Sequence, residues 1–261
     1  MRITILTENA AGGKLLAEHG ISYFIEIDDQ KILFDTGHSD VFLKNARQLG
    51  IDIEDEVEKV VLSHGHWDHG DGLKHLQNKK LITHPGAFIH RFRKRDFSPV
   101  GLSIGKKSLQ KNFSITETGE PLQITEHLWY LGEIPRNNDF EAQSTSFVDD
   151  FQHDDFIPDD SALAAVVKNR LIVITGCSHS GICNISEHAK KVTGISDVRA
   201  VLGGFHLKHN DEQTRKTIEY FKNEKVDEIY PSHCTELPAL AAFHAAFGNP
   251  QLKTGMVLEF Q

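Results

Sequence analysis

The chain has 261 residues, of which 39% are hydrophobic and 25% charged, a balance typical of a globular protein with a sizeable core. Its 37 acidic and 28 basic residues give a net charge of −9, which disfavours polyanionic partners such as nucleic acid or a membrane surface. No apolar stretch approaches the roughly 18 residues of a membrane helix, and the N-terminus lacks the apolar run of a signal peptide. We therefore expect a single cytoplasmic domain spanning residues 1–261. The three cysteines, Cys177, Cys183 and Cys234, do not suggest a disulfide framework.

The first half of the chain is predicted to consist of short strands and helices, beginning with an alternating strand at 2–7. Ser39 is expected to cap a helix that ends at Gly50. A buried strand at 59–62 runs directly into a cluster of histidines. The other elements expected here are a hairpin of strands 21–27 and 31–35 across the turn 28–30, a helix at 69–77 and a strand at 81–83.

Two stretches show little periodicity. Residues 88–119 are irregular and carry a basic run from Arg91 to Arg95, and residues 132–160 are predicted to form one long loop. The second half then repeats an order of strand, polar motif and helix. Its expected strands are 163–167, 171–175, 198–202, 228–230 and 256–260, and its expected helices are 184–192, 214–222 and 237–247.

The densest group of metal-ligand residue types is SHGHWDHGDG at 63–72, directly after a strand. His64 and His66 are two positions apart, so their rings point the same way in an extended segment. Asp68 and His69 follow a turn and would open the next helix. This spacing predicts two metals, with His64 and His66 on one and Asp68 and His69 on the other. Imidazole with carboxylate suits Zn²⁺, with iron and manganese as open alternatives.

The motifs of this chain resemble a known family. HGHWDH at 64–69 fits the His-x-His-x-Asp-His signature of the metallo-β-lactamase superfamily, and ILFDTG at 32–37 is similar to that superfamily's N-terminal half. Further motifs follow the order seen in its 7,8-dihydropterin-6-methyl-4-(ribofuranosyl)aminobenzene 5′-phosphate synthase-like branch. They are Glu8-Asn9, EHGISYFIE at 18–26, GEIPR at 132–136, TGCSHSGICNI at 175–185, GGFHL at 203–207 and HCT at 233–235. Glu236 departs from the glycine that this branch has after HCT.

The resemblance covers nearly the whole chain and implies the fold. The expected fold class is α/β, an αββα sandwich in which two mixed β-sheets pack face to face with helices outside. The resemblance also implies that Asp35 supports the metal loop from behind, because such partners orient histidine ligands.

The resemblance implies metal ligands in the second half as well. Three histidines there follow strands, His179, His206 and His233. We predict His179 and His233 as ligands, with His206 as the alternative to His233. The histidine that is not a ligand would contact substrate or act as a general acid. We therefore assign catalytic roles to His206 and Asp68.

Two further residues are candidates for a position between the metals. Cys177 stands where many relatives carry a bridging aspartate, so a thiolate ligand and a buried neutral cysteine both stay open. Asp160, just before a predicted strand, is the other candidate bridge.

The predicted chemistry is hydrolysis by water that two divalent ions, Zn²⁺ foremost, make reactive. No nucleophile triad stands out and the P-loop pattern is absent. The branch implies a phosphorylated small-molecule substrate and a synthase-type reaction. Arg136 is the candidate for binding a substrate anion, and the basic run is a second candidate; a solvated charge is the alternative for both.

Two other functions stay open from the sequence. One is a metal-binding sensor or structural module without turnover, and the other is a di-iron enzyme that reduces oxygen. In every case we expect a small-molecule partner, no nucleic acid and no membrane. The sequence leaves open whether the chain forms a homo-oligomer.

Overall fold

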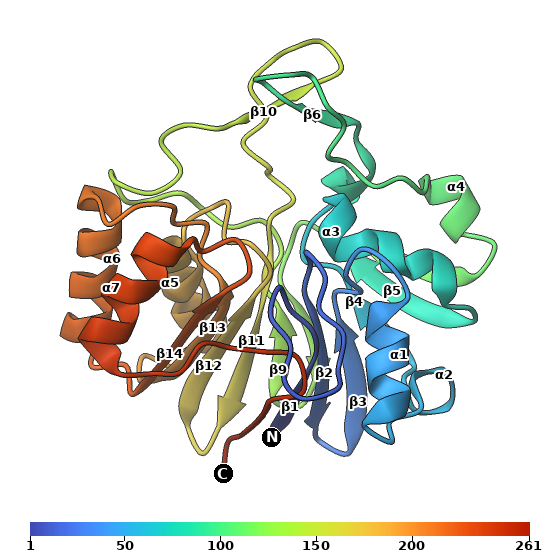
Figure 1. Ribbon diagram of the computed structural model, residues 1–261, viewed down its shortest axis with the longest axis horizontal. Helices are drawn as coiled ribbons and strands as arrows, with labels where there is room; N and C mark the ends of the chain where they lie inside the picture. Colours follow the sequence, from blue (N-terminus) through green and yellow to red (C-terminus); the bar gives the residue numbers. More distant parts are fainter.

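The computed structural model describes residues 1–261 as two β-sheets packed face to face, with helices on the outer faces (Figure 1). This arrangement confirms the αββα sandwich expected from the sequence. None of the helices combines the length and the hydrophobicity that a membrane-spanning segment requires.

The first sheet has seven strands in the order β15-β1-β2-β3-β4-β5-β7. Strands β3, β4, β5 and β7 run parallel, so their carboxyl ends meet at one edge. The strands are β1 (Arg2–Thr7), β2 (Ser22–Ile27), β3 (Gln30–Phe34), β4 (Lys59–Val61), β5 (Lys79–Thr83), β7 (Phe113–Glu117) and β15 (Val257–Glu259). The helices and 3₁₀ turns of this half are α1 (Val41–Gln48), α2 (Ile53–Glu56), α3 (Trp67–Gly70), η1 (Asp71–His75), η2 (Pro85–Phe88) and α4 (Lys106–Leu109).

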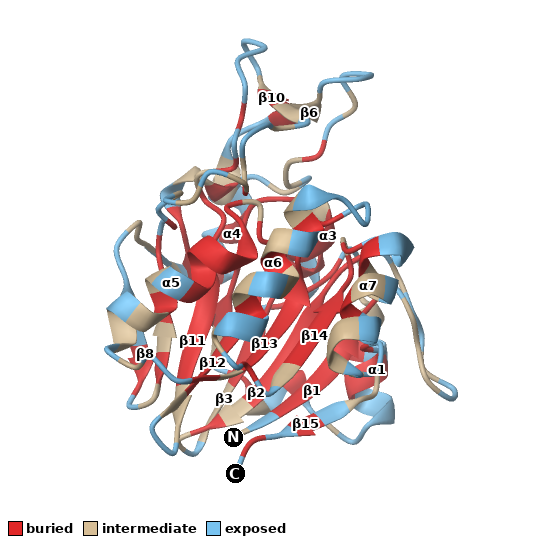
Figure 2. Cartoon of the chain, turned by 90° about the vertical axis from the view of Figure 1, so that its left-hand side faces the viewer, coloured by how far each residue is buried: buried red, intermediate tan, exposed pale blue.

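The second sheet has six strands in the order β14-β13-β12-β11-β9-β8. Strands β12, β13 and β14 run parallel because α5 and α6 connect them. The strands are β8 (Leu122–Thr125), β9 (Leu128–Tyr130), β11 (Ala162–Val167), β12 (Arg170–Thr175), β13 (Val198–Gly204) and β14 (Glu228–Ser232). Helices α5 (Ile182–Thr193), α6 (Glu212–Asn223) and α7 (Leu237–Phe247) cover its outer face, and Figure 2 shows the buried strands behind them.

The core between the sheets joins apolar residues from both inner faces. Ile25 and Ile32 from the first sheet belong to the same fully buried cluster as Leu163, Ile172 and Leu202 from the second. Each such side chain contributes about 1.5–3 kcal/mol when it leaves water. Two further apolar clusters lie outside the sheets, one under α5–α7 and one under α1, so each sheet is buried on both faces.

Two predicted boundaries are wrong. The expected helix at 69–77 is divided into α3 and η1, because Gly70 at their junction has φ −123° and ψ −9°, outside the α-helical region. Ser39 is not the N-cap of α1, which is Asp40. The Ser39 hydroxyl instead donates a hydrogen bond to Glu18 at 2.5 Å.

The two irregular stretches contain strands that the sequence did not reveal. Strand β6 (Arg91–Arg93) pairs with β10 (Phe147–Asp149), and the two form a ribbon above the sandwich (Figure 1). Strand β7 also lies in the stretch predicted to be irregular. Strands of three residues are too short to show a period. Strands β6 and β10 are also far apart in the sequence, so their pairing exists only in the folded chain.

Candidate metal centre

The predicted ligands converge where parallel strands of both sheets end. His64 follows β4, His179 follows β12, and His233 follows β14, so three separate strand ends supply imidazoles to one place. A loop at the carboxyl end of a strand can carry polar side chains because the strands themselves supply the rigid support.

The first ligand group is His64, His66 and His179. Nε2 of His64 lies 3.0 Å from Nδ1 of His66, and both rings lie 4.9 Å from the His179 ring, centroid to centroid. One nitrogen from each residue lies within 4.8 Å of the others.

These three histidines fit a cation. Nε2 of His66 and Nε2 of His179 are buried and have no hydrogen-bond partner, a costly state for a buried polar atom unless something else binds it. Burial lowers the pKa of all three imidazoles well below 6.5, so they are neutral and keep a lone pair for a metal.

The second ligand group contains Asp68, His69 and His233. Nε2 of His69 lies 3.2 Å from Nε2 of His233, and a carboxylate oxygen of Asp68 lies 3.4 Å from the same His233 atom. Burial alone would raise the pKa of Asp68, but the neighbouring histidines lower it well below its usual value. The residues predicted to hold the second metal are therefore brought together, with the carboxylate charged.

Sequence reasoning missed two residues beside this group, His19 and Asn9. Nε2 of His19 lies 3.1 Å from a carboxylate oxygen of Asp68, and the His19 ring lies 4.9 Å from the His233 ring. Asn9 accepts a hydrogen bond from Nδ1 of His233 at 2.9 Å and donates one to the His233 carbonyl at 3.0 Å. Both residues belong to motifs of the resemblance, but they lie in the loop after β1, where no strand end pointed to them.

Asp35 lies behind the ligands, as predicted. Its carboxylate accepts hydrogen bonds at 2.7 Å from Nδ1 of His69 and from both the amide and the hydroxyl of Ser63. A hydrogen bond to Nδ1 leaves Nε2 of His69 free to bind a metal. The Ser63 hydroxyl also lies 2.9 Å from Nδ1 of His64, so one carboxylate orients ligands of both groups.

The loop that carries the ligands needs glycine at Gly65. A Cβ at this position would lie 1.8 Å from the Ala87 carbonyl oxygen, a distance that no side chain tolerates. The Gly65 amide donates to Asp159 at 2.8 Å, which fixes the backbone between His64 and His66.

Four residues at the centre have a left-handed backbone. Their φ angles are 55° for Asp35, 53° for Ser178, 51° for His206 and 50° for His233. Each costs roughly 1–3 kcal/mol, and such residues cluster at active sites where surrounding contacts hold them. The strain here turns the chain at the strand ends that carry the ligands.

The two candidate bridging residues, Cys177 and Asp160, are both buried but differ in their contacts with the ligand groups. Cys177 is buried with Sγ 3.1 Å from Nε2 of His69, within reach of a shared metal, and burial raises the pKa of its thiol. Asp160 accepts from the Ser180 amide at 2.8 Å, and its second oxygen is buried without a partner. Burial raises the pKa of Asp160 to about 6. Asp160 is not part of either ligand group.

The candidate anion-binding arginines differ in their surroundings, and of the basic run only Arg93 lines the cavity over the ligand groups. Arg136 donates to the carbonyls of Phe156 and Ile157 and lines neither cavity next to the ligands. Arg91 is fully buried and paired with Asp155 and Asp159, so it is a structural cation and not a free anion-binding group.

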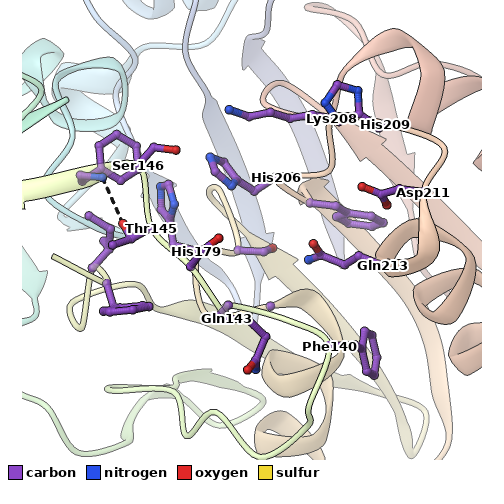
Figure 3. Close-up of a pocket in the computed structure, with 18 residues that line it drawn as sticks. Phe140, Gln143, Thr145, Ser146, His179, His206, Lys208, His209, Asp211 and Gln213 are labelled. Carbon is purple, nitrogen blue, oxygen red and sulfur yellow. Dashed lines mark hydrogen bonds between the residues drawn. The ribbon is translucent and has the colours of Figure 1, made fainter. Parts of the chain in front are cut away.

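Two cavities open beside the ligands. One of about 390 Å³ lies over the metal centre and is lined by His19, Asp68, His179 and His233 among others. The other, of about 250 Å³, lies beside it under the loop before β10 (Figure 3). His206 lines both, and burial lowers its pKa to about 4, so its ring is neutral near pH 7.

The chain is similar to known proteins over most of its length. The profile of the metallo-beta-lactamase superfamily matches residues 17–190. An uncharacterized protein of Methanocaldococcus jannaschii, MJ0448, is 36% identical over 245 residues, which cover 91% of this chain and 92% of that protein. A second relative in the same organism is the 7,8-dihydropterin-6-methyl-4-(β-D-ribofuranosyl)-aminobenzene-5′-phosphate synthase. It is 30% identical, and the match covers 100% of this chain and 97% of that protein.

The fold also matches a solved structure. The crystal structure of Tm1679, a metal-dependent hydrolase of the β-lactamase superfamily, superposes with a TM-score of 0.88 at 31% identity and covers 100% of this chain and 99% of that one. A diphosphatase of the PhnP family, at 13% identity and a TM-score of 0.56, shares the fold.

The sandwich and its histidine-rich strand ends define a metal-dependent enzyme. The chain belongs to the metallo-β-lactamase superfamily, and its full-length similarity to the synthase confirms the branch expected from its motifs.

Proposed function

We propose that this enzyme is a hydrolase that uses two divalent metal ions, Zn²⁺ foremost, on a small phosphorylated or otherwise anionic substrate. The observation that carries the proposal is the group of His64, His66 and His179, whose converging nitrogens include two that are buried without partners. Iron or manganese would also suit this mixture of imidazole and carboxylate.

The residues divide between holding the ions and holding the substrate. His64, His66 and His179 would hold one ion, and Asp68, His69 and His233 the other, with Asp35 orienting both sets. Bound ions of this kind lower the pKa of water and polarise the bond that is cleaved.

Two further residues would act next to the reacting bond. Asp68 accepts a hydrogen bond from His19 and faces His233, so it can hold an ion and orient a proton donor beside it. His206 is a neutral ring at the border of the two cavities, where it can donate one hydrogen bond to the substrate. Arg136 would act on the substrate indirectly, by holding the backbone of residues 156–157 in the cavity wall.

Metal analysis tests the proposal directly. We expect about two metal ions per chain in protein purified without added metal, and hydrolysis of bis(p-nitrophenyl) phosphate by that protein. The variant His64→Gln/His66→Gln should lose the first ion and the activity. The matched control is His75→Gln/His90→Gln, which removes two exposed histidines. Full activity in the first variant would end the proposal.

A second candidate is a synthase-type reaction at the same centre. It is supported by the full-length similarity to the named synthase, whose product carries a 5′-phosphate. Mass spectrometry of the products separates the two, because a synthase joins two substrates whereas a hydrolase adds only water. A sensor without turnover would bind metal normally and process no substrate.

We also propose that the protein is cytoplasmic, acts on a small molecule, and binds neither nucleic acid nor membranes. The net charge of −9 supports the last two points. Light scattering would report whether it forms a homo-oligomer.

A further inference from the structure

The cavity of about 250 Å³ next to the metal centre has its own set of walls. One wall is the loop before β10, with Phe140, Gln143 and Thr145, and another is formed by Lys208, from the segment between β13 and α6, and by Gln213 of α6 (Figure 3). A cavity of about 150 Å³ holds a benzene molecule, so this one has room for a ring with a polar substituent.

Lys208 lies at the border between the two cavities. It lines both of them, is exposed, and has no carboxylate within 4.0 Å and no hydrogen bond within the protein. In Figure 3 the amine of Lys208 and the rings of His179 and His206 extend toward the same space. An unpaired ammonium beside half-buried imidazoles, on a protein of net charge −9, is a binding point for an anion.

The one acidic residue that lines this cavity, Asp211, forms no ion pair with Lys208. Asp211 is the N-cap of α6, where its carboxylate accepts a hydrogen bond from the Thr214 amide at 3.1 Å. Figure 3 shows it near the start of that helix, on the side of the cavity away from the Lys208 amine. The carboxylates that line the neighbouring cavity are Asp68, which faces His19 and His233, and Glu236.

The rest of the lining suits a planar polar group. Phe140, Phe147 and Phe156 supply aromatic surface. The amide of Gln143 and the hydroxyls of residues 144–146 can donate and accept hydrogen bonds without charge.

We propose that this cavity is a subsite for the part of the substrate that does not react, and that Lys208 binds an oxyanion of that substrate between the subsite and the metal centre. The ligand class is a planar, hydrogen-bonding ring that carries a phosphate or carboxylate group. This inference rests on the proposed function only in placing the reacting bond at the metals.

Equilibrium binding of phenylphosphonate, which cannot be hydrolysed, tests the subsite without turnover. On Zn²⁺-loaded protein, Lys208→Gln should raise the calorimetric dissociation constant about tenfold, and Lys208→Arg should restore most of the affinity. The matched control is Lys222→Gln, an exposed lysine near the end of α6 that lines neither cavity. A change in Lys208→Gln no larger than in Lys222→Gln would overturn the role of Lys208.

A second variant tests whether the ring occupies the cavity. Ser144→Trp fills space from an exposed position in the loop, so it should weaken phenylphosphonate several-fold more than inorganic phosphate. Equal weakening of both would show that the ring lies elsewhere and would overturn the subsite. Benzoate in place of phenylphosphonate identifies which oxyanion Lys208 prefers.

The two proposals fail in different ways. If the wild-type protein binds phenylphosphonate through Lys208 but hydrolyses no probe, the hydrolase proposal fails and the subsite stands. If it hydrolyses bis(p-nitrophenyl) phosphate while Lys208→Gln and Ser144→Trp leave binding unchanged, the subsite proposal fails alone.

Discussion

Replacing Arg91 with methionine tests how the metal loop is supported. The guanidinium is fully buried and donates to Asp155 at 2.9 Å and to both oxygens of Asp159 at 2.7 and 3.0 Å. Asp159 in turn accepts from the amide of Gly65, between two predicted ligands. Methionine keeps much of the volume of the side chain and removes the charge.

The expected loss follows from what the variant leaves behind. Two carboxylates would stay buried without a cation, and breaking a buried pair by removing one partner costs about 3–5 kcal/mol. Because Asp159 would also lose the group that orients it, we expect metal affinity to fall about 10–100-fold. Adding Asp155→Asn and Asp159→Asn removes the unpaired charges and should recover part of the stability.

Urea unfolding in the presence of a chelator measures the free energy of unfolding of the metal-free protein. Without the chelator, bound metal would add to that free energy. The control is Arg95→Met, because Arg95 is exposed and its pair with Asp96 is solvated, so that variant should change little. If Arg91→Met is no less stable than Arg95→Met, the guanidinium is not a structural cation and our account of the loop is wrong.

Three further predictions concern the centre and the far end of the sandwich. Gly65→Ala should lower the free energy of unfolding by about 1–3 kcal/mol and reduce the amount of bound metal. The control Gly105→Ala, where a Cβ meets nothing within 4 Å, should change neither quantity. Urea unfolding measures the stability and elemental analysis measures the metal. Asp35→Asn should weaken metal binding about 10–100-fold, measured by competition with a chelator. An unchanged affinity would show that Asp35 does not orient the metal ligands. A hydrogen bond to Asp28 raises the pKa of His127 above 6.5, so its contribution to stability is complete below pH 6.5 and lost as pH rises through the folded-state pKa. An NMR titration should show that pKa falling in Asp28→Asn; a His127 pKa that does not move would contradict the assignment.

The ligand motif was readable because it is local. His64 and His66 are two residues apart after a buried strand, and Asp68 and His69 follow within the next turn, so short-range geometry alone brings four ligand types together. The order of strands and helices around the motif was also predicted, since apolar periodicity reports which residues face a core.

The role of the basic run could not be read from the sequence. Arg91 and Arg93 are two positions apart in the sequence. Arg91 is buried against aspartates about 64 residues away, whereas Arg93 lines the cavity over the ligand groups. The pairing of β6 with β10 gives the two arginines these different surroundings, and strands this short leave no periodic pattern in the sequence.

By itself the sequence determined the class of fold, the motif with the first four candidate ligands and the candidate strand ends of the second half. Only the tertiary structure decided that His19 joins Asp68 and His233, that Arg136 supports a cavity wall, and that Lys208 stays unpaired between two cavities. The physical reason is distance along the chain. A strand end or a helix face is set by neighbouring residues, but a contact between residues 19 and 233 exists only after both sheets have packed.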